Sequence, residues 1–236
     1  IKYDVSAMVT TDEEIGQSSQ LRYLKQFLEP VEGAYIFNLD ADAGFVTIAS
    51  LGALQLKIEV MGKSVHSGLA HLGKNAVEDS VSLMEEIRNL KKEVVSRKSS
   101  VDANPDTDLE KMEGKLNINM VNGGTKENVV PDKCTISLDR RLIPEEKMDE
   151  AERELFDTLE GLENVDWKVL DSSKVQSYHT KSQKVEELES LVKEVTGKSG
   201  RYGMMGSCDL YPVASKWGDE VFGLGVIRPD SSIHGK

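Results

Sequence analysis

A strict alternation of apolar and polar residues over positions 53–60 constrains the fold of this chain more than any other feature. The apolar members of this run are Leu54, Leu56, Ile58 and Val60. Successive side chains of a strand point to opposite faces of its sheet, so the pattern predicts a sheet with one covered face and one solvent-facing face. The apolar face requires helices to cover it.

The following residues supply the first of these helices. Asn75 is a suitable N-cap, because its side chain can accept from the free N–H groups of the first turn. Helical spacing predicts one buried stripe of apolar residues, namely Val77, Val81, Met84, Ile87 and Leu90. A polar loop around 99–111 is expected to follow.

Three strands and a second helix complete this middle segment. A strand with Leu116, Ile118 and Met120 directed inward leads through a "VNGGT" turn to a second strand, "CTISLDRRL". Pro144 is expected to open the helix, and a third strand, "VDWKVL", alternates again. The order βαββαβ predicts an antiparallel, ferredoxin-like sheet with both helices on one face.

The two ends of the chain have a different, α/β character. Strand, acidic loop, helix and the buried-type strand "AYIFNL" fill the first fifty residues, and a helix ending at Gly197, a glycine-rich turn "RYGMMGSCD" and the strand "VFGLGV" follow residue 178. We therefore predict an α/β fold in which a discontinuous domain, formed by residues 1–51 and 179–236, is interrupted by a domain spanning 52–178.

Charge, cysteine content and the lack of a long apolar run each argue against a class of protein. The formal net charge of −12 argues against a phosphate-binding surface, so nucleic acid is not an expected partner. Cys134 and Cys208 are far apart, which indicates no disulfide framework and suits a reducing cytosol. No apolar run is long enough to span a bilayer, so we expect a cytoplasmic protein without a membrane partner.

Groups that bind metals or protons follow the strands of the α/β part. Glu13 and Glu14 follow the first strand, Asp40 and Asp42 follow "AYIFNL", and His234 follows "VFGLGV". Ligands of open α/β sheets bind beyond the carboxyl ends of the strands, so these groups are expected to converge. Carboxylates and imidazole suit zinc, and equally cobalt or manganese. Taken alone, the Glu-Glu pair is also a common helix start.

Six motifs in order resemble one enzyme family. They are "TTDEEIG", "DADAG", "GKSVHSG" with "GKNAVED", "GGTKENVVPDKCTISLDRR", "GSCD" and the final histidine. Together they resemble the co-catalytic zinc amidohydrolases and exopeptidases, which include acetylornithine deacetylase, succinyl-diaminopimelate desuccinylase, aminoacylase, carboxypeptidase G and peptidase T-like enzymes. The resemblance implies a zinc-peptidase-like catalytic domain interrupted by a lid and dimerisation domain.

The resemblance also implies roles in metal binding and proton transfer. Glu13 is expected to act as the general base, and Glu14 to share one zinc with His234. Asp40 would bind a second zinc, with Asp42 as the alternative ligand. Two zinc ions per subunit are therefore expected in the complete protein.

Five further residues are implied, His66 in catalysis and the other four in substrate binding, and each also has a simpler interpretation. His66 would donate to the developing oxyanion from the lid of a partner subunit in a homodimer, or else is an exposed loop residue. Arg141 would hold the substrate carboxylate, or is solvated on the uncovered face. Asn128 would contact the scissile group, or is a turn residue. Gly206 and Ser207 would bind a carboxylate, or form a plain turn.

One part of the family pattern is missing. A His-x-Asp motif and a bridging Asp should precede the Glu-Glu pair, and neither occurs, so the chain is expected to be an incomplete and inactive fragment. The complete protein is expected to cleave the amide bond of an N-acyl amino acid or small peptide. The alternative is a catalytically inactive relative that serves as a dimerisation or binding module.

Overall fold

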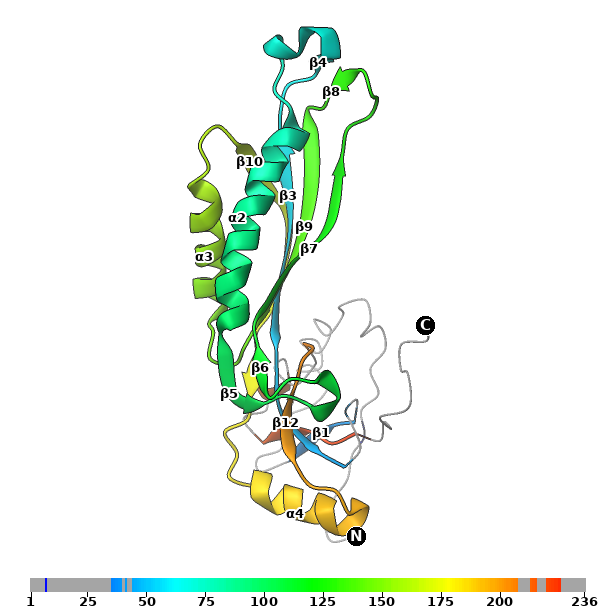
Figure 1. Cartoon of the computed structure of the whole chain (residues 1–236). Helices are drawn as coiled ribbons and strands as arrows, with labels where there is room; N and C mark the ends of the chain where they lie inside the picture. Colours follow the sequence, from blue (N-terminus) through cyan, green and yellow to red (C-terminus); the bar gives the residue numbers. More distant parts are fainter. Residues whose placement is uncertain are drawn as a thin grey trace.

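The computed structural model of the chain describes residues 7, 35–39, 41, 44–207, 213–215 and 220–225. These residues form an elongated molecule in which a tall four-stranded sheet stands above a second, smaller sheet (Figure 1). None of the helices in this described part is long and apolar enough to cross a bilayer.

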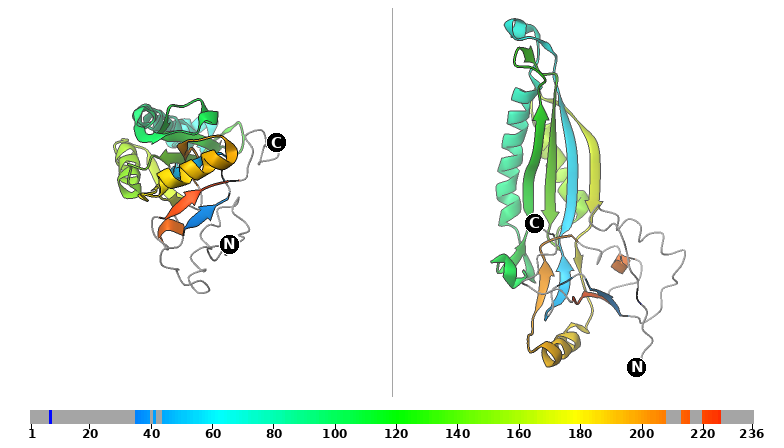
Figure 2. Two further views of the ribbon diagram at one scale, coloured as in Figure 1. Left: turned by 90° about the horizontal axis from the view of Figure 1, so that it is seen from below. Right: turned by 90° about the vertical axis from the view of Figure 1, so that its right-hand side faces the viewer.

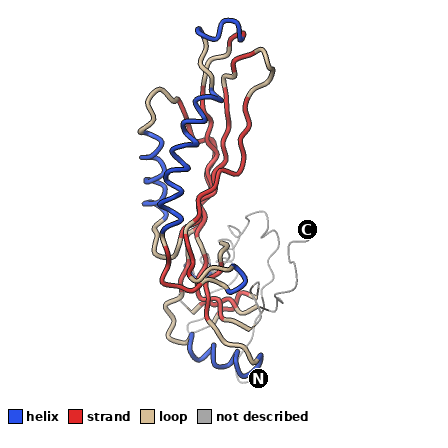
Figure 3. The backbone as a smooth tube through the Cα atoms, in the orientation of Figure 1, coloured by secondary structure: helices blue, strands red, loops and turns tan. Residues whose placement is uncertain are grey.

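The tall sheet has the predicted βαββαβ connectivity. Its strands, in their order across the sheet, are β10 (Asp166–Val175), β3 (Gly52–Met61), β9 (Lys133–Leu142) and β7 (Lys115–Gly123). Every neighbouring pair is antiparallel. Helices α2 (Ala76–Ser96) and α3 (Met148–Glu160) both cover one face, as Figure 3 shows. The ferredoxin-like fold predicted from the periodicity is confirmed.

The core of this domain lies between the sheet and the two helices. The four alternating apolar side chains of β3 are at most 2% exposed. They pack against a stripe of α2 whose buried members are Ala76, Ser80, Leu83, Ile87, Leu90 and Val94. Each buried Leu, Ile or Val side chain among them stabilises the fold by about 1.5–3 kcal/mol relative to an exposed one. Burial of these residues therefore fixes which face of the sheet is open.

The predicted stripe of α2 is partly wrong. Ile87 and Leu90 are buried, and Val77 and Met84 lie at the margin of the core, but Val81 is 48% exposed. The buried stripe runs through Ser80 instead, because the small serine places the helix close to the sheet while its hydroxyl donates to the carbonyl of Val77.

Two further expectations need correction. Met120 does not point inward but is 58% exposed, because the register of β7 shifts between Ile118 and Met120. A shift of this kind turns the following side chains away from the expected face. Pro144 lies in a turn and α3 begins only at Met148, since the Glu146 side chain accepts from Ile143 N at 3.0 Å and holds the turn.

Short elements extend the domain at both ends. At the far tip, β4 (Val65–His66) pairs with β8 (Val129–Val130) beside the 3-10 helix η3 (Ser67–Leu72). At the near end, the expected loop instead contains β5 (Lys98–Asp102) and β6 (Lys111–Glu113), joined through the 3-10 helix η4 (Pro105–Thr107). This ribbon reaches the smaller sheet, where Ala103 forms a bridge to Gly203.

The smaller sheet has mixed strand directions. Its strands are β1 (Ile36–Asn38), β13 (Val221–Gly223), β2 (Val46–Ser50), β11 (Tyr178–His179) and β12 (Arg201–Met204). Helix α4 (Val185–Thr196) lies at its lower end and ends at Gly197, which adopts the left-handed φ of 73° (Figures 1 and 2). The predicted glycine C-cap is confirmed.

Several parts of the smaller sheet differ from the expectation. The glycine-rich segment predicted as a turn contains β12, which runs parallel to β2. Strand β2 was not predicted, because all five of its residues are buried and show no alternation. Strand β1 was expected to be buried, but Phe37 is 39% exposed. The helix expected at 21–28 lies outside the described residues, and so does the strand expected at 5–9 except for Ala7, which is exposed.

Candidate functional site

Five of the predicted site residues lie outside the described part of the chain. They are Glu13, Glu14, Asp40 and His234, together with the alternative ligand Asp42. Within the described residues, no group of three or more His, Cys, Asp and Glu side chains is placed to hold a metal ion. The metal site therefore stays a prediction. The structure describes residues that lie next to the predicted ligands in the sequence.

The strand ends that lead to two predicted ligands lie side by side. Strands β1 and β13 are parallel neighbours, and beyond their ends Leu224 N donates to Asn38 O at 2.9 Å. Ala41, between Asp40 and Asp42, is 3% exposed. A side chain at Gly225 would collide with the carbonyl oxygen of Ala41. Gly225 thus lies tightly against Ala41, the residue between the two aspartates in the sequence.

Arg141 and Ser207 are in contact at the junction of the two sheets. Arg141 Nη1 donates to Ser207 Oγ at 3.2 Å. Strand β9 carries the arginine, and the loop after β12 carries the serine, held in place because Leu51 N donates to Gly206 O at 3.0 Å. Two segments predicted separately to bind substrate therefore meet, although they lie 66 residues apart in the chain.

The acidic side chain of Asp139 orients the guanidinium of Arg141. Arg141 Nε donates to Asp139 Oδ1 at 2.6 Å, and Nη2 donates to Oδ2 at 2.9 Å. Gln55, directly opposite on β3, donates to the same Oδ2 at 2.9 Å. These side chains lie on the face without helices, as the alternation predicted. The arrangement suits recognition of a carboxylate by a planar donor fork.

His66 and Asn128 meet at the opposite end, at the tip of the tall domain. His66 pairs with Val129 in the β4–β8 ribbon, and Ser67 N donates to Asn128 O at 2.9 Å. His66 Nδ1 accepts from Gly68 N at 3.2 Å, so the proton of the neutral ring resides on Nε2. Because His66 is exposed, this N–H can donate to a group outside the tip.

The two pairs are too far apart to act together within one chain. Lys133 pairs with Met61 at the start of β9, and His66 lies beyond that pair, toward the tip. The stretch of β9 from Lys133 to Arg141 alone spans about 26 Å at a rise of ~3.3 Å per residue. No side chain bridges that distance. His66 and the Arg141 of the same chain therefore cannot contact one small molecule together.

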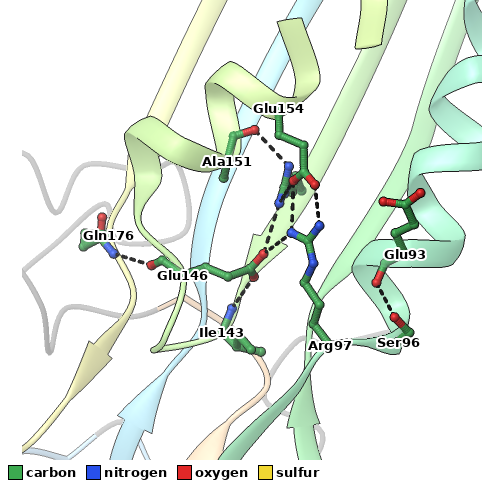
Figure 4. A network of polar contacts seen from close by, with 9 residues as sticks. Glu93, Ser96, Arg97, Ile143, Glu146, Ala151, Glu154 and Gln176 are labelled. Atoms are coloured by element: carbon green, nitrogen blue, oxygen red, sulfur yellow. Dashed lines mark hydrogen bonds and ion pairs between the residues drawn. The ribbon is translucent and has the colours of Figure 1, made fainter. Parts of the chain in front are cut away.

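Sequence reasoning missed one prominent polar cluster, shown in Figure 4. Arg140 is fully buried and contacts Glu146 at 3.0 Å and Glu154 at 2.6 Å, while Arg97 binds the same two carboxylates. Burial raises the pKa of Glu154, but hydrogen bonds from Arg97 and Arg140 outweigh it, and the pKa lies below the ordinary value. Strand alternation places Arg140 on the helix-covered face of the sheet. A charged residue at such a position was the sequence signal from which this cluster could have been predicted.

Known proteins are similar to this chain in sequence and in architecture. Residues 48–164 match the M20 peptidase dimerisation domain. The succinyl-diaminopimelate desuccinylase of Corynebacterium glutamicum is 30% identical over 132 residues, covering 55% of this chain and 33% of that enzyme. A probable carboxypeptidase of Paracoccidioides brasiliensis is 27% identical over 167 residues, covering 67% of this chain and 36% of that protein.

Solved structures extend the likeness to the smaller sheet. Aminopeptidase PepT from Bacillus cereus matches with a TM-score of 0.66 at 18% identity, covering 89% of this chain and 54% of that one. A tripeptidase from Staphylococcus aureus matches with a TM-score of 0.62 at 15% identity and the same coverage. The chain thus spans about half of these structures and only 33–38% of the first curated relatives.

The tall domain is therefore a peptidase dimerisation domain set on part of an α/β domain. The chain belongs to the M20 family of amidohydrolases and exopeptidases, and the resemblance predicted from its motifs is confirmed.

Proposed function

We propose that the complete protein is a metal-dependent hydrolase that cleaves the amide bond of an N-acyl amino acid or a small peptide. The observation that carries this proposal is the separation of two complementary half-sites on one dimerisation domain. An imidazole donor and Asn128 occupy its tip, and a guanidinium with a serine hydroxyl occupies its base. A homodimer in which each tip reaches the base of its partner would unite them.

The described residues have distinct roles in this proposal. Arg141 and Ser207 bind the carboxylate of the substrate, supported by the backbone of Gly206. The partner's His66 donates its Nε2–H to the oxygen that becomes negatively charged when the carbonyl is attacked, with Asn128 beside it. The contact of Arg141 with Ser207 and the tautomer of His66 support these roles.

The remaining roles belong to residues outside the described part. Glu13 removes the proton from the attacking water and returns it to the leaving amine. Glu14, Asp40 and His234 would hold two zinc ions per subunit, and cobalt or manganese suit the same donors. When bound, the metal supplies Lewis acidity that polarises the carbonyl. The packing of Gly225 against Ala41 supports the convergence of the last two ligands.

We further propose the domain limits, location and partners. The catalytic domain consists of 1–51 and 179–236, and the lid of 52–178. The first limit is supported because β2 belongs to the smaller sheet and β3 to the tall one, and the second because the chain changes sheets between the end of β10 at Val175 and the start of β11 at Tyr178. A cytoplasmic homodimer without nucleic acid or membrane partners accords with the net charge of −12.

Metal content and hydrolysis of the complete protein test the proposal together. We expect about two zinc equivalents per subunit, and hydrolysis of N-acetyl amino acids or dipeptides. Glu13→Gln should lower kcat by roughly 10²–10⁴-fold with the metal retained. Glu163→Gln, in an exposed loop of the lid, is the matched control. A dimer with neither metal nor hydrolysis would contradict the proposal and favour the binding-module alternative.

A further inference from the structure

The side chains of Gln55, Asp139, Arg141 and Ser207 form a continuous polar chain across the open face of the lid sheet. Asp139 is at its centre, with only 10% of its side chain exposed, whereas Arg141 is 27% exposed. The carboxylate receives two N–H groups from Arg141 and one from Gln55. A buried carboxylate with three donors is held firmly in position.

These contacts determine which part of the guanidinium remains available. Arginine has five N–H groups, and Asp139 takes one from Nε and one from Nη2 while Ser207 takes one from Nη1. Within the described part of the chain, one N–H on Nη1 and one on Nη2 have no acceptor, and these two nitrogens form the outer end of the guanidinium fork. Ser207 accepts from Arg141 and keeps its own hydroxyl proton to donate. The free donors therefore suit the two oxygens of one carboxylate.

We infer that Asp139 and Gln55 are positioning residues that fix Arg141 in this orientation and thereby make the site selective for a carboxylate over a neutral amide. The inference rests on the proposed function for the role of Arg141 but concerns different residues. Without Asp139, the guanidinium could rotate about its side-chain bonds and present Nε to the ligand. Without Gln55, Asp139 loses the donor that ties it to β3.

Equilibrium binding to the complete protein tests this inference without requiring turnover. Levulinate is the probe, because a methylene replaces the scissile N–H of N-acetylglycine and it cannot be cleaved there. Its neutral amide, levulinamide, has the same shape. By titration calorimetry, the unmodified protein should prefer levulinate roughly tenfold or more, since hydrogen bonds between a guanidinium and a carboxylate are stronger than those to a neutral amide.

The variants distinguish positioning from a merely structural role. Asp139→Asn and Arg141→Lys should each reduce the preference at least severalfold, and the double variant should show no further reduction. Gln55→Leu, at an exposed position, should reduce it partially. Ser137→Ala, on the same face of β9, is the matched control and should leave it unchanged.

Each result supports or contradicts the inference. An Asp139→Asn or Gln55→Leu protein that keeps the full preference, even with a lowered melting temperature, would overturn it, and so would unmodified protein without any preference. Preference that depends on both residues, in a protein that hydrolyses nothing, would uphold the inference and defeat only the proposed function.

Discussion

The ion cluster around Arg140 shows how the lid keeps a charged group in its core. Arg140 Nη1 donates to the carbonyl of Ala151 at 2.9 Å, and its Nη2 contacts both Glu146 and Glu154. Arg97, at the end of α2, closes the cluster. A buried charge is tolerated only when it is paired and hydrogen-bonded, so these contacts hold α2, α3 and β9 together.

Glu154→Gln should make this contribution measurable. The pKa of Glu154 is lowered from its ordinary 4.5, so the stabilisation is present above that pH and is lost as the pH falls through the lower folded-state pKa. We expect the substitution to cost about 2 kcal/mol of unfolding free energy near neutral pH, and the cost to shrink below pH 4.5.

Chemical denaturation of both proteins between neutral and acidic pH provides the measurement. Glu150→Gln, in an exposed pair with Lys147, is the control and should have little effect at any pH. A cost for Glu154→Gln that is independent of pH would show that packing, not charge, is lost.

The sheet face on which a side chain lies was predictable wherever apolar and polar residues alternate strictly along the strand. Alternation correctly placed Arg141 on the open face of the sheet. It could not reveal the contact with Ser207, because that contact depends on how the segment after β12 folds back to Leu51. The exposed Met120 was mispredicted for a related reason, since a local register shift breaks the period of two that the prediction assumes.

The elements of the lid were predictable because most of them have one covered and one open face. Strand β2 has no such contrast, since it is buried on both sides, and the glycines of "RYGMMG" obscure β12. The smaller sheet is therefore the part that sequence periodicity describes least well. Its β2 is central to it, being paired with β11, β12 and β13.

The two outer strands of the lid differ in a way that bears on dimerisation. Residues 116–123 of β7 carry no charge, and Met120 and Val121 are 58% and 46% exposed. Strand β10 instead carries Lys168, Asp171 and Lys174 and has its own register shift. Both strands contain a register shift, so charge is the feature that differs between them. Charges protect an edge from pairing, so β7 is the edge expected to meet a second copy.

Val121→Asp should therefore weaken the homodimer. A charge in a strand-to-strand interface is left desolvated, and dissociation should be visible by light scattering coupled to gel filtration of the complete protein. Val169→Asp on β10, where the native side chain is 37% exposed, is the matched control and should remain dimeric. Dissociation by the control alone would assign the interface to the opposite edge.

The elongated shape makes each proposed active site dependent on two chains. Figure 2 shows the tip of the lid projecting far from the smaller sheet. The tip carries His66 and the base carries Arg141, so in the proposed homodimer one chain would supply halves of two different sites. In a symmetric dimer, the two composite sites are equivalent, and each uses the tip of the other subunit.

Mixing two inactive variants should consequently restore activity. A His66→Ala subunit retains Glu13 and Arg141, and a Glu13→Gln subunit retains His66, so a mixed dimer contains one intact site and one doubly defective site. Random exchange of equal amounts gives half mixed dimers, and about a quarter of the original kcat should return. Dimers exchanged by mild denaturant and refolding, with each variant alone as control, provide the measurement. If His66 served its own chain, the mixed dimer would have no intact site, and activity would stay at the level of the separate variants.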